Sequence, residues 1–502
     1  MRVSDNATGI QNAEHFDVGR LTMGRSTNRE QKSALGQFLT PYSIAQFMAS
    51  LFTKRAFESC RLLDPGAGLG ALTGAFIERW RARQIVANTL DVTAFEIDDR
   101  LRNRLSETSA ERWQHEGLTV QLVGGDFIEE ASLSLLGYRK ERLSFTHAIL
   151  NPPYKKISTD STHRQYLRKV GIETVNLYSG FLGLVIRLME AGGEIVAIVP
   201  RSFCNGLYYK PFREILATET AIRHIHLFHS RDSAFKDDAV LQENVILLLE
   251  KHGEKGTVTI STSTDDTFAD VGFHQAPFGT IIQDGDDELF IHIPTSPGQS
   301  EIELSSAIFS SLSDLGVQVS TGPVVDFRVR QHLRAVPETG SVPLIYPIHF
   351  VNQQTVWPRI DQKKPNAIMV DRETERSLYP SGFYTVVRRF SSKEENRRIV
   401  AHTIQPQDFG FSPLGFENHL NVFHHGKRGL DENLARGLTA FLNSTAVDTH
   451  FRRFNGHTQV NATDLRSMKY PSREWLIQLG QWSQQHRTPT QGELDNEIRK
   501  IA

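Results

Sequence analysis

The chain has 502 residues, more than one ordinary domain holds, so we expect roughly two or three domains. Hydrophobic residues make up 39% and charged residues 23%, as in typical globular proteins. No apolar run reaches the length of about 18 residues that a membrane span requires, and we expect none. Cys60 and Cys204 are the only cysteines. This excludes a disulfide framework and a cysteine-rich zinc site and indicates a reducing cytoplasm, and we expect no metal site.

Charge is distributed unevenly along the chain. The formal net charge is −2, which argues against a general nucleic-acid binder. Residues 321–500, however, hold 24 Lys and Arg against 18 Asp and Glu, together with nine of the 19 histidines. A basic C-terminal third indicates a polyanionic partner, although a chance excess of cations on a solvated surface would give the same count.

Residues 1–30 are polar and aperiodic, so we expect a flexible lead segment. After it, short apolar runs alternate with amphipathic stretches, which predicts an α/β domain with a mostly parallel sheet. The runs cover 61–65, 91–98, 118–127, 145–153 and 192–200, with helices expected at 72–83 and 177–190. Two more expected strands, 222–228 and 243–251, follow without a helix between them and could close the sheet as a hairpin.

A turn-rich break at residues 251–256 is the expected domain boundary, which makes 31–256 the α/β domain. Residues 257–475 contain short strands, prolines and a late helix near 433–443, and we expect a mixed α+β domain there. Residues 476–502 are expected to form a C-terminal tail.

Asp64-Pro65-Gly66-Ala67-Gly68-Leu69-Gly70 links an expected strand to an expected helix. The glycines allow a tight turn and a close approach to a ligand, although a plain strand-to-helix turn would look the same. The next two strands end in Glu96, which suits ribose hydroxyls, and in Asp126, which suits an adenine amine with Phe127 against the ring. An acid at a strand end is often a helix cap. Three acids, Asp64, Glu96 and Asp126, at the carboxyl ends of successive parallel strands predict a nucleoside site.

Asn151-Pro152-Pro153-Tyr154 ends the fourth expected strand. The prolines hold the backbone extended, so the Asn151 side-chain oxygen and a proline carbonyl keep fixed directions. Two acceptors suit an NH₂ group, and holding both N–H bonds of a base's exocyclic amine favours its attack on a methyl donor. Tyr154 offers a stacking face for a base flipped out of a duplex. A proline turn after a buried strand is the alternative.

Together these segments resemble the gamma class of amino-methyltransferases, the TaqI-like N6-adenine DNA methyltransferases, and above all the members paired with PstI- or BsuBI-type endonucleases. Residues 35–41, Leu-Gly-Gln-Phe-Leu-Thr-Pro, match a further motif of this class. The resemblance implies a Rossmann-like domain with a seven-stranded, mostly parallel sheet that binds S-adenosyl-L-methionine. The implied cofactor-binding residues are Thr40, Pro41, Asp64, Gly66, Gly68, Glu96, Ile97, Asp126, Phe127 and Phe181.

The resemblance also implies a second aromatic ring for the flipped base after residue 200, and the spacing to Phe212 favours Tyr209 over Tyr208. The implied catalytic residues are Asn151, Pro152, Pro153, Tyr154 and Tyr209. More weakly, the resemblance extends to 320–475, where this class has its target recognition domain. Segments 417–422 and 455–461 are similar to PstI-like members. The implied DNA contacts are Arg452, Arg453 and His457, with a basic helix face as the alternative.

The resemblance thus implies a monomeric enzyme that methylates the N6 amine of a flipped-out adenine at a specific site in double-stranded DNA. A separate cognate restriction endonuclease is its implied partner. Two alternatives remain: an enzyme with the same Asn-Pro-Pro-Tyr core that acts on RNA or on a protein glutamine, and a modification subunit of a larger restriction complex.

Overall fold

The chain divides into two compact units, Met1–Pro297 and Gly298–Ala502, here called unit 1 and unit 2. The computed structural model describes residues 15–22, 39–53, 56–228, 243–283, 285–294, 307–351, 354–391, 395–410, 412–455, 458–486 and 489–500.

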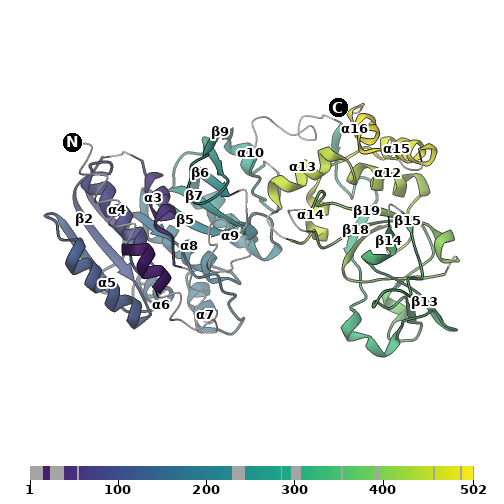
Figure 1. Cartoon of the computed structure of the whole chain (residues 1–502), viewed down its shortest axis with the longest axis horizontal. Helices are drawn as coiled ribbons and strands as arrows, with labels where there is room; N and C mark the ends of the chain where they lie inside the picture. Colours follow the sequence, from purple (N-terminus) through teal and green to yellow (C-terminus); the bar gives the residue numbers. More distant parts are fainter. Residues whose placement is uncertain are drawn as a thin grey trace. The chain divides into compact units, whose positions relative to one another are not determined.

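Unit 1 is built on a sheet with the strand order β3-β2-β1-β4-β5-β7-β6-β8-β9 (Figure 1). Its first seven strands along the chain are β1 (Ala56–Asp64), β2 (Val86–Phe95), β3 (Leu118–Val123), β4 (Phe145–Leu150), β5 (Met189–Pro200), β6 (Thr220–Phe228) and β7 (Asn244–Lys251). Strands β1 to β5 pair in parallel, whereas β7 is antiparallel to both β5 and β6. The expected mostly parallel sheet with a late antiparallel pair is therefore observed, but the sheet has nine strands instead of the expected seven.

Helices cover both faces of this sheet (Figure 1). One hydrophobic cluster includes side chains of α3 (Tyr42–Ser50), α4 (Ala71–Arg81) and α5 (Asp99–Arg112). The other includes side chains of α6 (Phe127–Leu135), α8 (Leu177–Leu188) and α9 (Lys210–Glu219). Every residue of β4 is buried. Parallel strands require cover on both faces, and this cover fixes the positions of the strand ends.

A short helix at residues 15–22 is anchored on unit 1. Phe16 is 3% exposed, and its ring stacks on that of Tyr42 with 5.1 Å between centroids. The Asp17 carboxylate accepts a hydrogen bond from the backbone N–H of Tyr42. For 15–22 the structure thus differs from the expected flexible lead segment, because a buried ring holds the helix in place. The remainder of 1–30 lies outside the described residues.

The sheet continues beyond the expected boundary at residue 256. Strand β8 (Thr257–Ser263) pairs in parallel with β6, and β9 (Gly272–Pro277) pairs antiparallel with β8. Val258 and Ile260 are fully buried in a core cluster of unit 1. The boundary therefore lies near Pro297, and the turn-rich segment 251–256 is a connection within the sheet.

Unit 2 contains two main sheets. One has four strands: β11 (Gln318–Thr321), β21 (Leu420–His424), β18 (Tyr384–Arg388) and β19 (Ala401–Ile404). The other has five: β12 (Leu333–Arg334), β16 (Ala367–Met369), β13 (Ser341–Ile345), β20 (Leu414–Phe416) and β17 (Leu378–Tyr379). Ile345, Tyr384 and Phe416 from the two sheets share one hydrophobic cluster. The expected mixed α+β class is observed here.

The end of unit 2 is helical. Helix α12 (Glu432–Leu442) lies where a late helix was expected, and α13 (Thr445–Phe454), α15 (Arg473–Gln485) and α16 (Gln491–Arg499) follow. A Cβ at Gly437 of α12 would lie 1.8 Å from the carbonyl oxygen of Leu476, so only glycine allows α12 and α15 to approach so closely. The expectation of a C-terminal tail is therefore wrong for residues 476–485 and 491–499, which are helical. None of the helices in the described ranges is long and apolar enough to cross a membrane.

The turn between β1 and α4 contains a buried acid. Asp64 is fully buried, and its Oδ2 accepts a 2.7 Å hydrogen bond from the hydroxyl of Thr73 in α4. Burial raises the pKa of Asp64 to about 7, against the hydrogen bonds from Thr73 and from the backbone N–H of Gly66. The folded chain therefore keeps this carboxyl protonated at pH values at which the unfolded chain ionises it.

We predict that Asp64 causes the free energy of unfolding to fall as the pH rises from 3.8, the ordinary pKa of this group, to about 7. A carboxyl whose pKa is raised by folding releases its proton on unfolding, so stability falls across this window and is level above it. Because one pKa unit corresponds to about 1.4 kcal/mol, Asp64→Asn should remove up to roughly 4 kcal/mol of this dependence. Urea unfolding across the window measures it.

The exposed Asp91 on β2 offers the matched control Asp91→Asn, which should leave the pH profile of stability as in the wild type. Parallel profiles for the wild type and Asp64→Asn would show that Asp64 is ionised in the folded chain.

Candidate cofactor-binding and catalytic site

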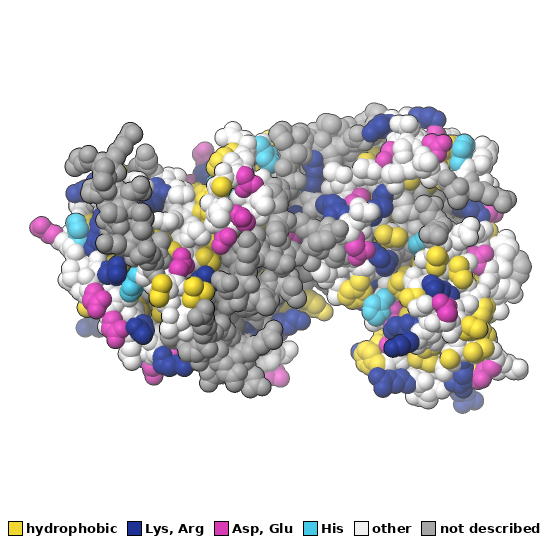
Figure 2. Space-filling view, in the orientation of Figure 1, with side chains coloured by type: hydrophobic (Ala, Val, Ile, Leu, Met, Phe, Trp, Pro, Cys, Tyr) yellow, Lys and Arg dark blue, Asp and Glu magenta, His cyan; other side chains and the backbone are white. Residues whose placement is uncertain are grey.

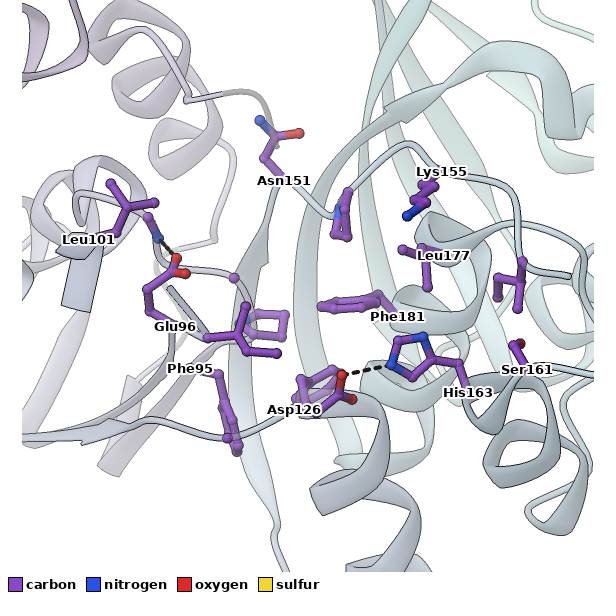
Figure 3. A pocket seen from close by; sticks show the side chains of 18 of the residues that line it. Phe95, Glu96, Leu101, Asp126, Asn151, Lys155, Ser161, His163, Leu177 and Phe181 are labelled. Carbon is purple, nitrogen blue, oxygen red and sulfur yellow. Dashed lines mark hydrogen bonds and ion pairs between the residues drawn. The ribbon is translucent and has the colours of Figure 1, made fainter. Parts of the chain in front are cut away.

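The carboxyl ends of β1 to β4 meet at one edge of the unit 1 sheet, because these strands are parallel. An open cavity of about 310 Å³ lies at this edge (Figure 3). Its wall includes Gly66 after β1, Glu96 after β2, Asp126 after β3 and Asn151 after β4. The structure thus brings the four strand-end segments selected from the sequence into one cavity.

Gly66 and Gly68 form a wall without side chains. A Cβ at Gly66 would meet no atom within 4 Å, so this part of the cavity is open up to the backbone. A ligand can therefore lie directly against the loop. Asp64, expected to contact a ligand from the same loop, does not line the cavity, because its side chain is buried on Thr73.

Glu96 lines the cavity although it is only 4% exposed. Its Oε2 accepts the backbone N–H of Gly68, and its Oε1 accepts that of Asp98, each at 2.8 Å. Burial raises the pKa of Glu96, while these two hydrogen bonds oppose the shift. The carboxyl group is therefore held in a fixed orientation at the wall of the cavity.

Asp126 pairs with His163, a residue that the sequence analysis did not select. Asp126 Oδ1 accepts the backbone N–H of Glu129 at 3.1 Å, and Oδ2 lies 2.7 Å from His163 Nε2 (Figure 3). Burial raises the pKa of Asp126, but the hydrogen bonds from His163 and Glu129 outweigh it, and the pKa lies below its ordinary value. The bond to Asp126 raises the pKa of His163. His163 belongs to α7 (Thr162–Lys169), and no sequence motif marks it.

Three of the expected cofactor contacts give the cavity an apolar part. Ile97 is 53% exposed and lines the cavity beside Glu96. Phe127 is buried, and its ring centroid lies 5.1 Å from that of Phe181, which also lines the cavity (Figure 3). Apolar side chains next to two fixed carboxyl groups suit a ligand that has a ring and several hydrogen-bond donors.

Asn151 is oriented by the segment before α3. Its Nδ2 donates a 3.0 Å hydrogen bond to the hydroxyl of Thr40. Pro41 follows directly, and its carbonyl accepts the N–H of Ala45 in the first turn of α3. Pro152 is buried and Pro153 lines the cavity, so the backbone beyond Asn151 is also fixed. The bond to Thr40 uses the amide nitrogen, which orients the amide oxygen as well.

Tyr154 is half-buried at the end of this segment. Its hydroxyl donates a 3.2 Å hydrogen bond to the carbonyl of Ile198 in β5, and burial raises the pKa of Tyr154. Its ring meets that of Tyr178 edge to face, with 6.3 Å between centroids. Tyr154 is therefore fixed by the sheet on one side.

The structure does not support the choice of Tyr209 as a stacking ring. Tyr209 is 8% exposed, its ring stacks on Tyr178, and its hydroxyl accepts a hydrogen bond from Asn176. Tyr208, in contrast, is 71% exposed. Buried Arg213 donates to the carbonyls of Phe203 and Gly206, which fixes the turn that directs Tyr209 inward. Spacing along the sequence could not show which tyrosine this turn exposes.

The two arginines selected for DNA contact are largely or partly buried in unit 2. Arg453 is only 8% exposed. Arg452 Nε pairs with Asp448 at 2.7 Å, and its Nη2 donates to the carbonyl of Glu395. Both arginines are therefore packed or paired within unit 2. The alternative interpretation, a basic helix face without a DNA contact, is compatible with this arrangement. His457 lies outside the described residues.

The segments 417–422 and 455–461 contact each other in unit 2. Asn421 Nδ2 donates to the carbonyl of Val460 at 2.7 Å, and the N–H of Val460 donates to the carbonyl of Arg389. Buried Asn455 accepts a hydrogen bond from Arg398. Asn421 and Asn455 of these segments thus hold strands and loops of unit 2 together.

Comparison with known proteins places this geometry in a family. The model of the Eco57I restriction-modification methylase family matches residues 48–235. The chain is 50% identical over 493 residues to the type II methyltransferase M.BsuBI of Bacillus subtilis, covering 97% of each chain. It is 42% identical to the type II methyltransferase M.PstI of Providencia stuartii, covering 89% of this chain and 88% of that protein.

Among solved structures, the type IIL restriction-modification enzyme MmeI in complex with DNA aligns with a TM-score of 0.50 and 11% identity. The alignment covers 99% of this chain and 75% of MmeI, and at this identity it supports the fold alone. The near-complete match to M.BsuBI goes further: the chain belongs to the type II methyltransferases of restriction–modification systems.

Proposed function

We propose that this protein methylates the N6 amine of an adenine that is flipped out of double-stranded DNA at a specific site. The observation that carries the proposal is the position of Asn151 at the buried end of β4, in the wall of the cavity that also contains Glu96 and Asp126. The chemistry of each part of the cavity fits one part of this reaction.

S-adenosyl-L-methionine is the cofactor of these methyltransferases, and the cavity suits it. Glu96 offers acceptors for the two ribose hydroxyls, and Asp126 offers one for the adenine amine. Ile97 and Phe181 supply apolar surface for the adenine ring. The open space at Gly66 leaves room beside the loop, where a side chain would block it. When bound, the cofactor supplies an electrophilic methyl group on a sulfonium centre.

The target amine is assigned to Asn151 and to the carbonyl of Pro152. The bond from Asn151 to Thr40 fixes the amide, and the two oxygens are fixed acceptors for an NH₂ group. Acceptors that hold both N–H bonds stabilise a pyramidal nitrogen, whose lone pair is then available. Cytosine has an exocyclic amine too. The resemblance of the sequence motifs to N6-adenine enzymes favours adenine.

Target recognition is assigned to unit 2. Figure 2 shows Lys and Arg side chains interspersed with hydrophobic ones on the lower part of this unit. Phe327 is 61% exposed with the Arg328 guanidinium over its ring, and Ile360 is 70% exposed close in sequence to the exposed Lys363. Cations contact phosphates, and apolar groups contact base edges. Because one chain carries both units, we propose that the enzyme acts as a monomer. Its cognate restriction endonuclease would be a separate protein.

We predict that Asn151→Ala lowers the rate of methyl transfer to DNA by about 10²–10³-fold, the usual cost of losing one polar group that stabilises a transition state. The cofactor Kd should change little, because Glu96 and Asp126 remain. Transfer of tritiated methyl groups to DNA and calorimetric titration with the cofactor measure the two effects. Asn103→Ala, at an exposed position of α5, is the matched control. Near-normal turnover of Asn151→Ala would refute its catalytic role.

We predict that Tyr208, rather than Tyr209, stacks on the flipped base. Tyr208→Ala should weaken binding of a duplex with 2-aminopurine at the target position by about 1–3 kcal/mol and reduce the quenching of its fluorescence. Tyr138→Ala, at a tyrosine that is 73% exposed, should have no effect. Tyr209→Leu should mainly lower thermal stability, because Tyr209 is buried. The opposite pattern, normal base binding by Tyr208→Ala and a loss by Tyr209→Leu at unchanged stability, would restore Tyr209.

A further inference from the structure

A second, smaller cavity of about 30 Å³ adjoins the first. The two cavities share Leu39, Gly66, Gly68 and Asn151 as wall residues, so they adjoin each other at the glycine loop. The smaller cavity is also lined by Phe16 and Arg20 of the helix at 15–22, a segment for which the sequence indicated no role.

The helix at 15–22 rests on the glycine loop. Besides the stacking of Phe16 on Tyr42, a Cβ at Gly19 would lie 3.4 Å from the side chain of Leu69, an ordinary van der Waals contact. These contacts fix the backbone from which Arg20 extends. The position of Arg20 relative to Gly66 and Gly68 is therefore determined by packing.

Arg20 is the one charged side chain among the described residues that line the smaller cavity. Its side chain is 14% exposed, and its Nε lies 3.6 Å from Asp17 Oδ1. A guanidinium has five N–H donors in a planar fork, so a contact with Asp17 at Nε is compatible with a second acceptor at the other nitrogens. The guanidinium is the one charged group on the described wall of this cavity, and a planar carboxylate matches its fork of donors.

We propose that Arg20 binds the carboxylate at the methionine end of S-adenosylmethionine, which makes the helix at 15–22 part of the cofactor site. This inference rests on the proposed position of the cofactor, with its adenosine end at Glu96 and Asp126. From there the amino-acid end extends past Gly66 and Gly68 to the smaller cavity, since these glycines line both spaces. The size of this cavity suits a group of a few atoms.

The test compares two ligands that differ only in this carboxylate: S-adenosylmethionine and decarboxylated S-adenosylmethionine. Calorimetric titration of the full chain without DNA gives their Kd values for the wild type, Arg20→Gln and Arg20→Lys. Arg20→Gln should raise the Kd of S-adenosylmethionine about 10- to 100-fold, the usual effect of losing a hydrogen bond to a charged group, and change that of the decarboxylated ligand less than about threefold. Arg20→Lys should retain part of the preference.

Two control variants distinguish the possible failures. Arg104→Gln, at an arginine whose side chain is 64% exposed on α5, should leave both Kd values unchanged. Glu96→Gln should weaken both ligands alike, because they share the ribose. Equal weakening of both ligands by Arg20→Gln, or no weakening of either, would overturn the role of Arg20. No effect of Glu96→Gln on either ligand would instead overturn the proposed position of the cofactor.

Discussion

Parallel pairing of β1 to β4 between two layers of helices is the constraint on which the site depends. Parallel strands place their carboxyl ends at the same edge, so four loops that are far apart in the sequence must meet there. Because β4 is buried along its whole length, the backbone directly before Asn151 is fixed by packing. The chemistry of the cavity thus follows from strand direction and burial before any ligand is considered.

Short hydrogen bonds within the loops then set the direction of each functional group. Glu96 is held by two backbone N–H groups, Asp126 by Glu129 and His163, and Asn151 by Thr40. Each of these side chains is polar and partly or fully buried, and leaving such groups without partners would cost about 1–3 kcal/mol each. The bonds that satisfy them also preorganise the site, because the acceptors keep one orientation when a ligand arrives.

Sequence reasoning correctly predicted the position of residues that lie at a strand end. Glu96, Asp126 and Asn151 were selected for that reason, and all line the cavity. It could not predict the orientation of a side chain. A single turn exposes Tyr208 and buries Tyr209, and α13 engages Arg452 and Arg453 within unit 2. No periodic pattern shows that a cation donates to a carbonyl distant in the sequence, as Arg452 does to Glu395.

The domain limits illustrate the same difficulty on a larger scale. A Gly- and Lys-rich turn at 251–256 marks a chain reversal equally well between domains and within a sheet, and only the pairing of β8 with β6 shows which it is. His163 had no signal in the sequence, since it reaches Asp126 only through the packing of α7. Contacts between distant segments thus account for most of what the sequence left undetermined.

The central claim is that the acceptors at the end of β4 hold the exocyclic amine of adenine. The most direct measurement is mass spectrometry of the nucleosides from DNA treated with the enzyme and S-adenosylmethionine that has a deuterated methyl group. We predict that the label appears in N6-methyldeoxyadenosine and in no other nucleoside. Label in N4-methyldeoxycytidine or in C5-methyldeoxycytidine would contradict it.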